Sequence, residues 1–126
     1  MKRIITVIVI IVLMIGLSTA ALVHLITATD QMQHTLDQIL EAVEQNKIGQ
    51  VQNLTDQFQK QWTKNENIMT RYIHHDELDL IHGIVARLAP LIRYNDIAEY
   101  TAEVERLREL IWHIRESEIP SLKNIF

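Results

Sequence analysis

Histidine and carboxylate side chains offer the clearest chemistry in this chain of 126 residues. His75, Asp79 and His82 are spaced i, i+4 and i+7, so they would share one face of a helix. His113 lies further on, with one glutamate four residues before it and another three residues after it. Zinc, manganese and iron accept such ligands. The spacing therefore makes His75, Asp79, His82 and His113 candidate metal ligands.

A structural interpretation of the same residues is stronger. Asp79 is explained by its place near the start of a helix, where a negative charge is favourable. His82 and His113 flank an apolar stripe instead of lying within it. The chain has neither the HExxH motif of zinc enzymes nor the paired ExxH motifs of di-iron bundles. We therefore expect no bound metal and no cofactor, with a pH-sensing histidine cluster as an alternative.

The composition excludes several classes of function. There is no cysteine, so the chain has no thiolate zinc site, no cysteine nucleophile and no disulfide. Its three glycines form no phosphate-binding loop, and no serine lies in a nucleophile-elbow pattern. The formal net charge of −4 disfavours binding to nucleic acid. The sequence therefore predicts a protein that is not an enzyme and does not bind nucleic acid.

The N-terminal segment predicts a membrane anchor. Residues 4–23 carry no charged side chain, and as a helix they would span about 30 Å, the thickness of a bilayer core. Lys2 and Arg3 precede this run and favour a cytoplasmic N-terminus. We therefore expect a single-pass protein of the cell membrane. Residues 1–26 would be its cytoplasmic stub and anchor, and residues 27–126 its extracytoplasmic domain.

Two features of the apolar run leave alternatives open. Ser18 and Ala20 match the small-x-small site of a cleaved signal peptide, but the apolar residues continue through Val23, which is long for such a peptide. Gly16 and Ala20 lie about one turn apart and would let the span pack closely against another helix. That helix would belong to a second copy of the chain, giving a homodimer, or to a different membrane protein.

Helical periodicity covers the rest of the chain. Apolar residues recur at steps of three and four in four stretches. In chain order these are residues 29–47, residues 50–73, the stretch from residue 76 to the Asn95-Asp96 break, and residues 97–117. We expect Gly49 to be the left-handed residue after the first stretch, Pro90 to kink or shorten the third, and the fourth to stop near Ser117, ahead of Pro120. The pattern predicts an all-α, antiparallel up-down bundle of four helices, the first of which can continue the span. Three helices plus a free stalk are the alternative.

Alternating helix directions would create a distinct pole at the membrane end of the bundle. The turn at residues 73–79, the C-terminal tail and all six histidines would meet there. Trp112 lies beside the apolar stripe, where it is either an interface anchor or, more often, a side chain packed beneath the tail. We predict a partner-binding surface at this pole, made of His75, Glu77, Asp79, Trp112, Leu122, Asn124, Ile125 and Phe126.

Several short motifs resemble those of a known family. They are Trp62, the run His75-x-Glu77-x-Asp79, and the C-terminal Ser121-Leu-Lys-Asn124-Ile125. Together they resemble a family of short, single-span bacterial proteins of unknown function, found mainly in Gram-positive spore-forming lineages. The resemblance covers nearly the whole chain. It implies an anchored architecture and a small multi-pass membrane protein as partner, and it implies no reaction.

Two functions of different classes remain. The first is a non-enzymatic, membrane-anchored interaction module, an accessory subunit of a bacterial membrane protein complex. The second is an extracytoplasmic sensory or ligand-binding bundle. A sensor would need a partner to signal, because only three residues precede the apolar run.

The length of the apolar run predicts that the anchor is retained in the mature protein. N-terminal sequencing of the protein purified from membranes should give a chain that begins at or near Met1. A mature chain that begins at Ala21 would show instead that the run is a signal peptide.

Overall fold

The computed structural model describes the backbone of residues 1–125 and the side chains of residues 1–71 and 73–116. Within these residues the chain folds into four helices and no strand, which confirms the all-α prediction. The helices are α1 (Lys2–Glu44), α2 (Ile48–Tyr72), α3 (His75–Arg93) and α4 (Ile97–Ile125).

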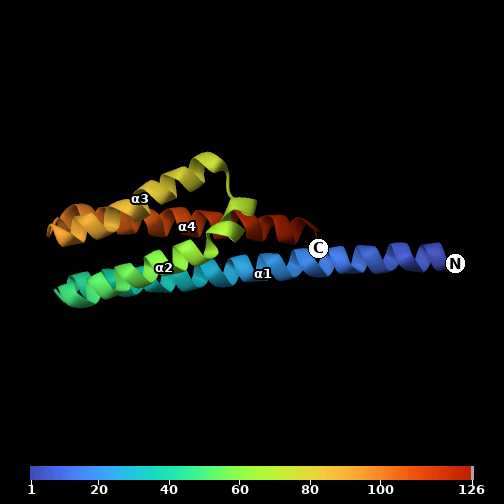
Figure 1. Cartoon of the computed structure of the whole chain (residues 1–126), viewed down its shortest axis with the longest axis horizontal. Helices are drawn as coiled ribbons and strands as arrows, with labels where there is room; N and C mark the ends of the chain where they lie inside the picture. Colours follow the sequence, from blue (N-terminus) through green and yellow to red (C-terminus); the bar gives the residue numbers. More distant parts are fainter. Residues whose placement is uncertain (126) are drawn as a thin grey trace.

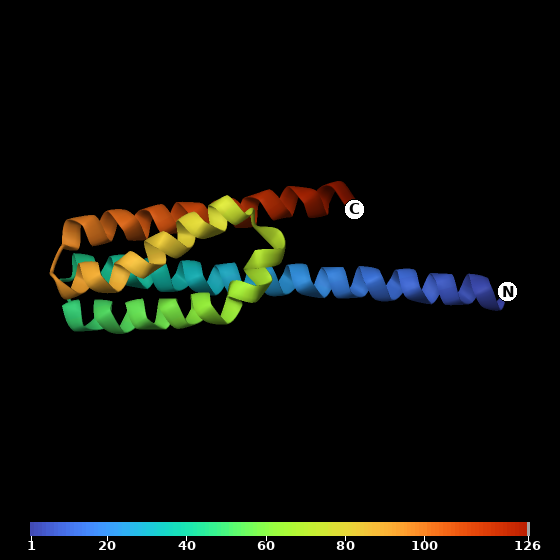
Figure 2. The same ribbon diagram turned by 45° about the horizontal axis from the view of Figure 1, so that its top comes forward.

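The four helices run alternately up and down (Figures 1 and 2). Each helix packs on two others: α1 on α2 and α4, and α3 on the same two helices. The α1–α2 and α3–α4 turns lie together at one end of the bundle, and the α2–α3 turn lies at the other end, where α1 projects from the bundle (Figure 2). α1 and α3 therefore occupy opposite corners of the bundle, as do α2 and α4.

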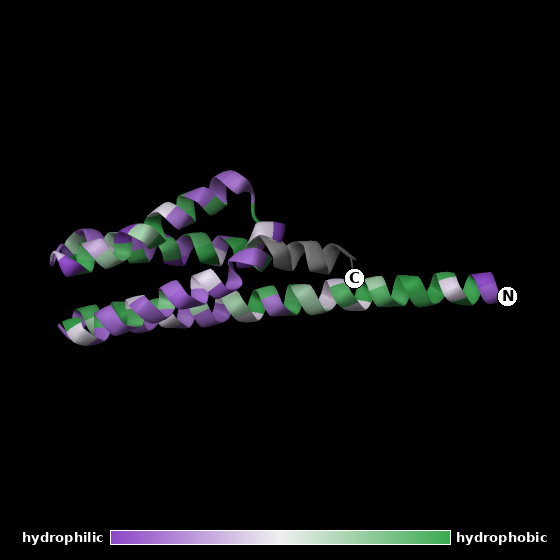
Figure 3. Cartoon of the chain, in the orientation of Figure 1, coloured by the Kyte–Doolittle hydropathy of each residue, from purple (hydrophilic) through white to green (hydrophobic). Residues whose placement is uncertain are grey.

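Helix α1 joins the apolar run to the bundle without a break. After Lys2 and Arg3, its residues up to position 20 are exposed and mostly apolar (Figure 3), and burial begins near Leu25, which is 1% exposed. The helix is long and apolar enough to cross a membrane. It contains an 18-residue stretch with a mean hydropathy of 2.8, and no residue of that stretch is buried. The second half of α1 contributes the buried Met32, Leu36 and Ile39. The first bundle helix is therefore part of the core and is not a free stalk.

The predicted apolar stripes form one continuous core. Residues such as Phe58 on α2, Ile81 on α3, and Val104 and Leu107 on α4 are 0% exposed. They recur every three or four residues, so each helix turns one face inward. Burial of these faces removes apolar surface from water, which is the main term that stabilises a bundle of this kind.

Both turns at the far end of the bundle use an asparagine in the left-handed conformation. Asn46 has φ 58° and Asn95 has φ 60°. The amide of Lys47 donates to the carbonyl of Ala42 at 3.0 Å, and the amide of Asn46 donates to that of Val43 at 3.1 Å. This pair of bonds is the Schellman motif, which satisfies carbonyls at a helix end. The prediction for Gly49 was wrong, because Gly49 lies inside α2 with negative φ and asparagine tolerates the left-handed region.

The two hairpins repeat the same local structure. Moving 49 positions along the chain takes Asn46 to Asn95, and it takes the inward residues Phe58 and Trp62 of α2 to the inward residues Leu107 and Ile111 of α4. The bonds at the second turn match as well, with the Asp96 amide on the Leu91 carbonyl at 3.0 Å. The bundle is therefore two equivalent helical hairpins, although the apolar periodicity by itself does not reveal the repeat.

The two prolines have smaller effects than the sequence suggested. Helix α3 continues one turn beyond Pro90 and ends at Arg93. The predicted stop near Ser117 was wrong, because the backbone of α4 stays helical through Pro120 to Ile125. A proline removes one intrahelical hydrogen bond, but the remaining bonds let the helix continue on either side.

A buried polar pair crosses the core between α2 and α4, which do not pack directly against each other. Thr55 Oγ1 donates to the Val51 carbonyl at 2.7 Å. The Tyr100 hydroxyl in turn forms a hydrogen bond with Thr55 Oγ1. Tyr100 is 0% exposed and Thr55 is 2% exposed. Burial raises the pKa of the Tyr100 hydroxyl above its ordinary value of 10.0.

Replacement of Tyr100 by phenylalanine should lower the free energy of unfolding by about 1 kcal/mol near neutral pH, because the core loses one hydrogen bond. The native state holds the Tyr100 proton more tightly than the unfolded state, so this contribution is complete below pH 10.0 and is lost as pH rises through the raised native pKa. Denaturant unfolding of the full chain in detergent, from about pH 8 to about pH 11, measures both effects. If the two proteins lose stability in parallel above pH 10.0, Tyr100 is not protected in this way.

Candidate functional site

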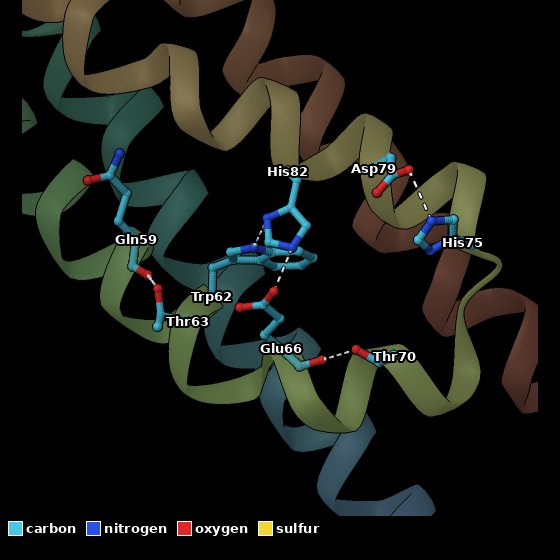
Figure 4. Close-up of polar contacts among 8 residues, drawn as sticks. All are labelled: Gln59, Trp62, Thr63, Glu66, Thr70, His75, Asp79 and His82. Atoms are coloured by element: carbon cyan, nitrogen blue, oxygen red, sulfur yellow. Dashed lines mark hydrogen bonds and ion pairs between the residues drawn. The ribbon is translucent and has the colours of Figure 1, made fainter.

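The best-defined polar cluster joins α2 to α3 through His82 (Figure 4). Trp62 Nε1 donates to His82 Nδ1 at 3.2 Å, and His82 Nε2 lies 2.7 Å from Glu66 Oε1. The two rings meet edge to face, with centroids 5.3 Å apart. Because Trp62 is 2% exposed, its N–H depends on His82 for a hydrogen-bond partner.

These contacts fix the protonation pattern of the His82 ring. Nδ1 accepts from tryptophan, which can only donate, so the proton is on Nε2 and is shared with Glu66. The histidine is neutral in this arrangement. The cluster therefore joins the buried Trp62 N–H of α2 to α3 through His82.

The histidines named by the sequence do not form one site. His75 pairs with Asp79 at 3.4 Å, and both side chains are mostly exposed, at 85% and 64%. His82 faces Glu66 and Trp62 instead, so the i, i+4, i+7 face is split between two partners (Figure 4). His113 is exposed on α4. Among the described residues, no group of three histidine or carboxylate side chains is arranged to hold a metal ion.

A groove of about 670 Å³ lies between α1 and α4. Two ion pairs cross it: Arg108 Nε lies 2.9 Å from Asp37 Oδ1, and Arg115 Nη1 lies 3.0 Å from Asp30 Oδ1. Gln33 Nε2 also donates to the Arg108 carbonyl at 2.7 Å. The lining residues are Asp30, Gln33, His34, Asp37, Glu105, Arg108, Glu109, Trp112 and Arg115. Four carboxylates and two guanidinium groups leave this groove acidic.

Trp112 is a half-exposed wall of the same groove. It is 49% exposed, and the guanidinium of Arg115 lies 5.3 Å from its ring centroid. A tryptophan left this accessible beside charged groups is a typical anchor for a partner. The structure therefore gives Trp112 neighbours on α1 and α4, while the predicted tail residues Leu122, Asn124, Ile125 and Phe126 lie outside the described side chains.

The predicted partner surface is divided between two faces. His75, Glu77 and Asp79 lie at the start of α3, beside the α2–α3 turn. Trp112 lies in the α1–α4 groove, and α3 does not pack on α1. The α2–α3 turn lies at the end of the bundle from which the apolar run projects (Figures 1 and 2). In the span, nothing lies within 4 Å of a Cβ added at Gly16, so the face shared by Gly16 and Ala20 is open.

Sequence reasoning missed the partners of these residues. No motif in the sequence singles out Glu66 or the aspartates of α1. Only the pairing of helices brings Glu66 to His82, or Asp37 to Arg108. The one available signal was Trp62, since an inward-facing tryptophan needs an acceptor for its N–H.

The comparisons with known proteins add a family match. A family model described as a domain of unknown function (DUF4363) matches residues 19–125. Neither the curated proteins nor the solved structures contain a significant match.

The His82 cluster should contribute measurably to stability. Replacement of His82 by phenylalanine keeps an aromatic ring at this position but removes the nitrogen that accepts from the buried Trp62 N–H. The loss of this acceptor should lower the free energy of unfolding by about 1–3 kcal/mol. The matched control is His75→Phe, which removes an exposed pair and should cost less than about 0.5 kcal/mol. Denaturant unfolding in detergent compares them. Equal losses would mean that the buried acceptor has no special role.

Proposed function

Because the chain belongs to the DUF4363 family, a family of unknown function, we propose its function from its own architecture. The protein is a non-enzymatic, membrane-anchored interaction module, and it serves as an accessory subunit of a bacterial membrane protein complex. Its partner is a multi-pass protein in the same cell membrane.

The continuity of α1 carries this proposal. The exposed apolar run passes directly into residues of the core, such as Leu25 and Met32, with no flexible linker between them. A bundle attached in this way keeps a fixed height and a restricted tilt above the bilayer. That arrangement suits a protein that presents a surface to a neighbour in the membrane.

Charge supports an extracytoplasmic bundle held clear of the lipid surface. Lys2 and Arg3 favour a cytoplasmic N-terminus. Residues 27–126 carry 10 lysines and arginines and 16 aspartates and glutamates, a net charge of −6. Anionic headgroups repel such a domain, so its surface is available to proteins more than to lipid.

The polar contacts favour a structural role over a catalytic one. The ion pairs of Arg87 with Glu99 and Glu103, at 3.2 and 3.1 Å, link α3 to α4. The His82 cluster links α2 to α3, and the aspartate–arginine pairs link α1 to α4. Each contact joins neighbouring helices, which is the task of a structural network.

A sensory or ligand-binding bundle is the second candidate. The observation in its favour is the 670 Å³ groove between α1 and α4, which has the size of a small-molecule site. A ligand for this groove would raise the melting temperature of the purified chain, whereas an interaction module would be stabilised only by its protein partner.

Affinity purification of the full chain in mild detergent tests the proposal. A multi-pass membrane protein should co-purify with the wild-type chain. Gly16→Ile should lower its recovery several-fold, because a large side chain would separate the span from a closely packed partner helix.

Ser18→Ile is the matched control, since it enlarges a small residue about half a turn away on the same span. It should leave the recovery unchanged. If no multi-pass protein co-purifies from its native membrane, the accessory-subunit proposal fails. If it co-purifies equally with both variants, the partner does not use the face of Gly16.

A further inference from the structure

Two carboxylates on the α4 wall of the groove form no ion pair with a lysine or arginine among the residues that the structure describes. The groove arginines, Arg108 and Arg115, are each held by an aspartate of α1 at 2.9 and 3.0 Å. Glu105 and Glu109 lie one turn apart on α4, and both are exposed. The groove therefore keeps two negative charges that its own arginines do not neutralise.

Matching positive charges lie on the outer face of α2. Lys60 and Lys64 are also one turn apart and exposed, and neither forms an ion pair with another described residue. They border a shallow polar depression of about 430 Å³ on α2. Its lining residues are Asn53, Asp56, Gln57, Lys60, Gln61 and Lys64.

The two charged pairs lie at nearly the same level of the bundle. Thr35 of α1 donates to Gln61, the neighbour of Lys60, at 2.9 Å. Gln33 of α1 donates to the carbonyl of Arg108, at 2.7 Å, between the two glutamates. Both pairs are therefore beside the same turns of α1, within about one helical pitch of 5.4 Å.

Anchoring converts this shared level into a shared height above the membrane. Neighbouring copies enter one bilayer through the same span, so they point the same way and are confined to the same depth. Each copy then presents its lysine pair at the level of the next copy's glutamate pair. Confinement also raises the effective concentration, so that modest surface contacts are enough for association.

We propose that the α1–α4 groove of one copy binds the outer face of α2 from a second copy in the same membrane. Glu105 and Glu109 of the first face Lys60 and Lys64 of the second. The half-exposed Trp112, one turn beyond Arg108 on the groove wall, packs against the incoming helix and becomes buried. Because the two surfaces differ, the contact is head to tail, and it builds a ring or a row of copies. The inference rests on the proposed membrane anchoring.

Cysteine cross-linking in the membrane tests the contact, and the absence of native cysteine makes introduced thiols unique. One full-length copy carries Glu109→Cys and a first tag, and a second copy carries Lys64→Cys and a second tag. A short bifunctional thiol reagent should join the two tags. The matched control pairs Glu109→Cys with Ala86→Cys, which is exposed on α3 outside the proposed contact. The test pair should give roughly fivefold more product than the control.

Charge exchange tests the electrostatic pairing. With the cross-linking positions moved to His34→Cys, which lines the groove, and Gln57→Cys, which lines the depression on α2, the pair Glu105→Lys and Glu109→Lys should lower the yield roughly fivefold. The pair Lys60→Glu and Lys64→Glu should do the same. All four changes in one chain restore opposite charges and should restore the yield. All four sites are exposed, so thermal melting should show intact folding.

The outcomes separate this inference from the proposed anchoring. A chain that fractionates as soluble overturns the anchoring, and the inference with it. A membrane-bound chain whose test pair cross-links no better than the Ala86 control overturns the inference alone. Cross-linking that ignores both reversals, or that the fourfold exchange fails to restore, also overturns the pairing. If a charge variant has a lowered melting temperature, the pair Glu105→Gln and Glu109→Gln is used in its place. A cross-linking yield that this neutral pair leaves unchanged then counts against the proposal.

Discussion

One helix, α1, has two halves with different apolar patterns, and the rest of the structure follows from that difference. The first half of α1 exposes apolar side chains all round, as a helix in lipid does. Its second half shows a single apolar stripe that is buried against α2 and α4. With no glycine or proline between Gly16 and Gly49, the helix has no point at which to bend freely. The direction of the span therefore sets the direction of the bundle.

The bundle built on α1 is a pair of equivalent hairpins. Each closes with a left-handed asparagine at the end remote from the apolar run, and the inward residues recur with the same offset. The unequal parts are the connections at the other end. There the α2–α3 turn, with His74 and His75, lies at the end from which the apolar run projects (Figure 2).

Polar contacts join each helix to the next around the bundle. Aspartate–arginine pairs join α1 to α4, Arg87 joins α3 to α4, and the His82 cluster joins α2 to α3. Thr55 and Tyr100 connect opposite corners through the core. Exposed ion pairs contribute little individually, whereas the buried hydrogen bonds are costly to leave unsatisfied. The buried pairs therefore fix which helix faces lie together, and the apolar core supplies most of the stability.

The sequence by itself determined the features that depend on local periodicity. Steps of three and four predicted four helices and their inward faces, including Phe58, Leu88 and Leu107, because a helix places such residues on one side. The uncharged N-terminal run predicted a helix long enough for a membrane. Only the tertiary structure decided which helices are neighbours, because periodicity within one helix carries no information about its partners. The tertiary structure paired His82 with Glu66 instead of with Asp79, and it placed Trp112 in a groove with α1, away from His75. It also assigned the left-handed turn to Asn46 over Gly49, and it carried α4 through Pro120. The physical reason for the helix pairing is that contacts between helices depend on residues far apart in the sequence, which the pattern within one helix does not encode.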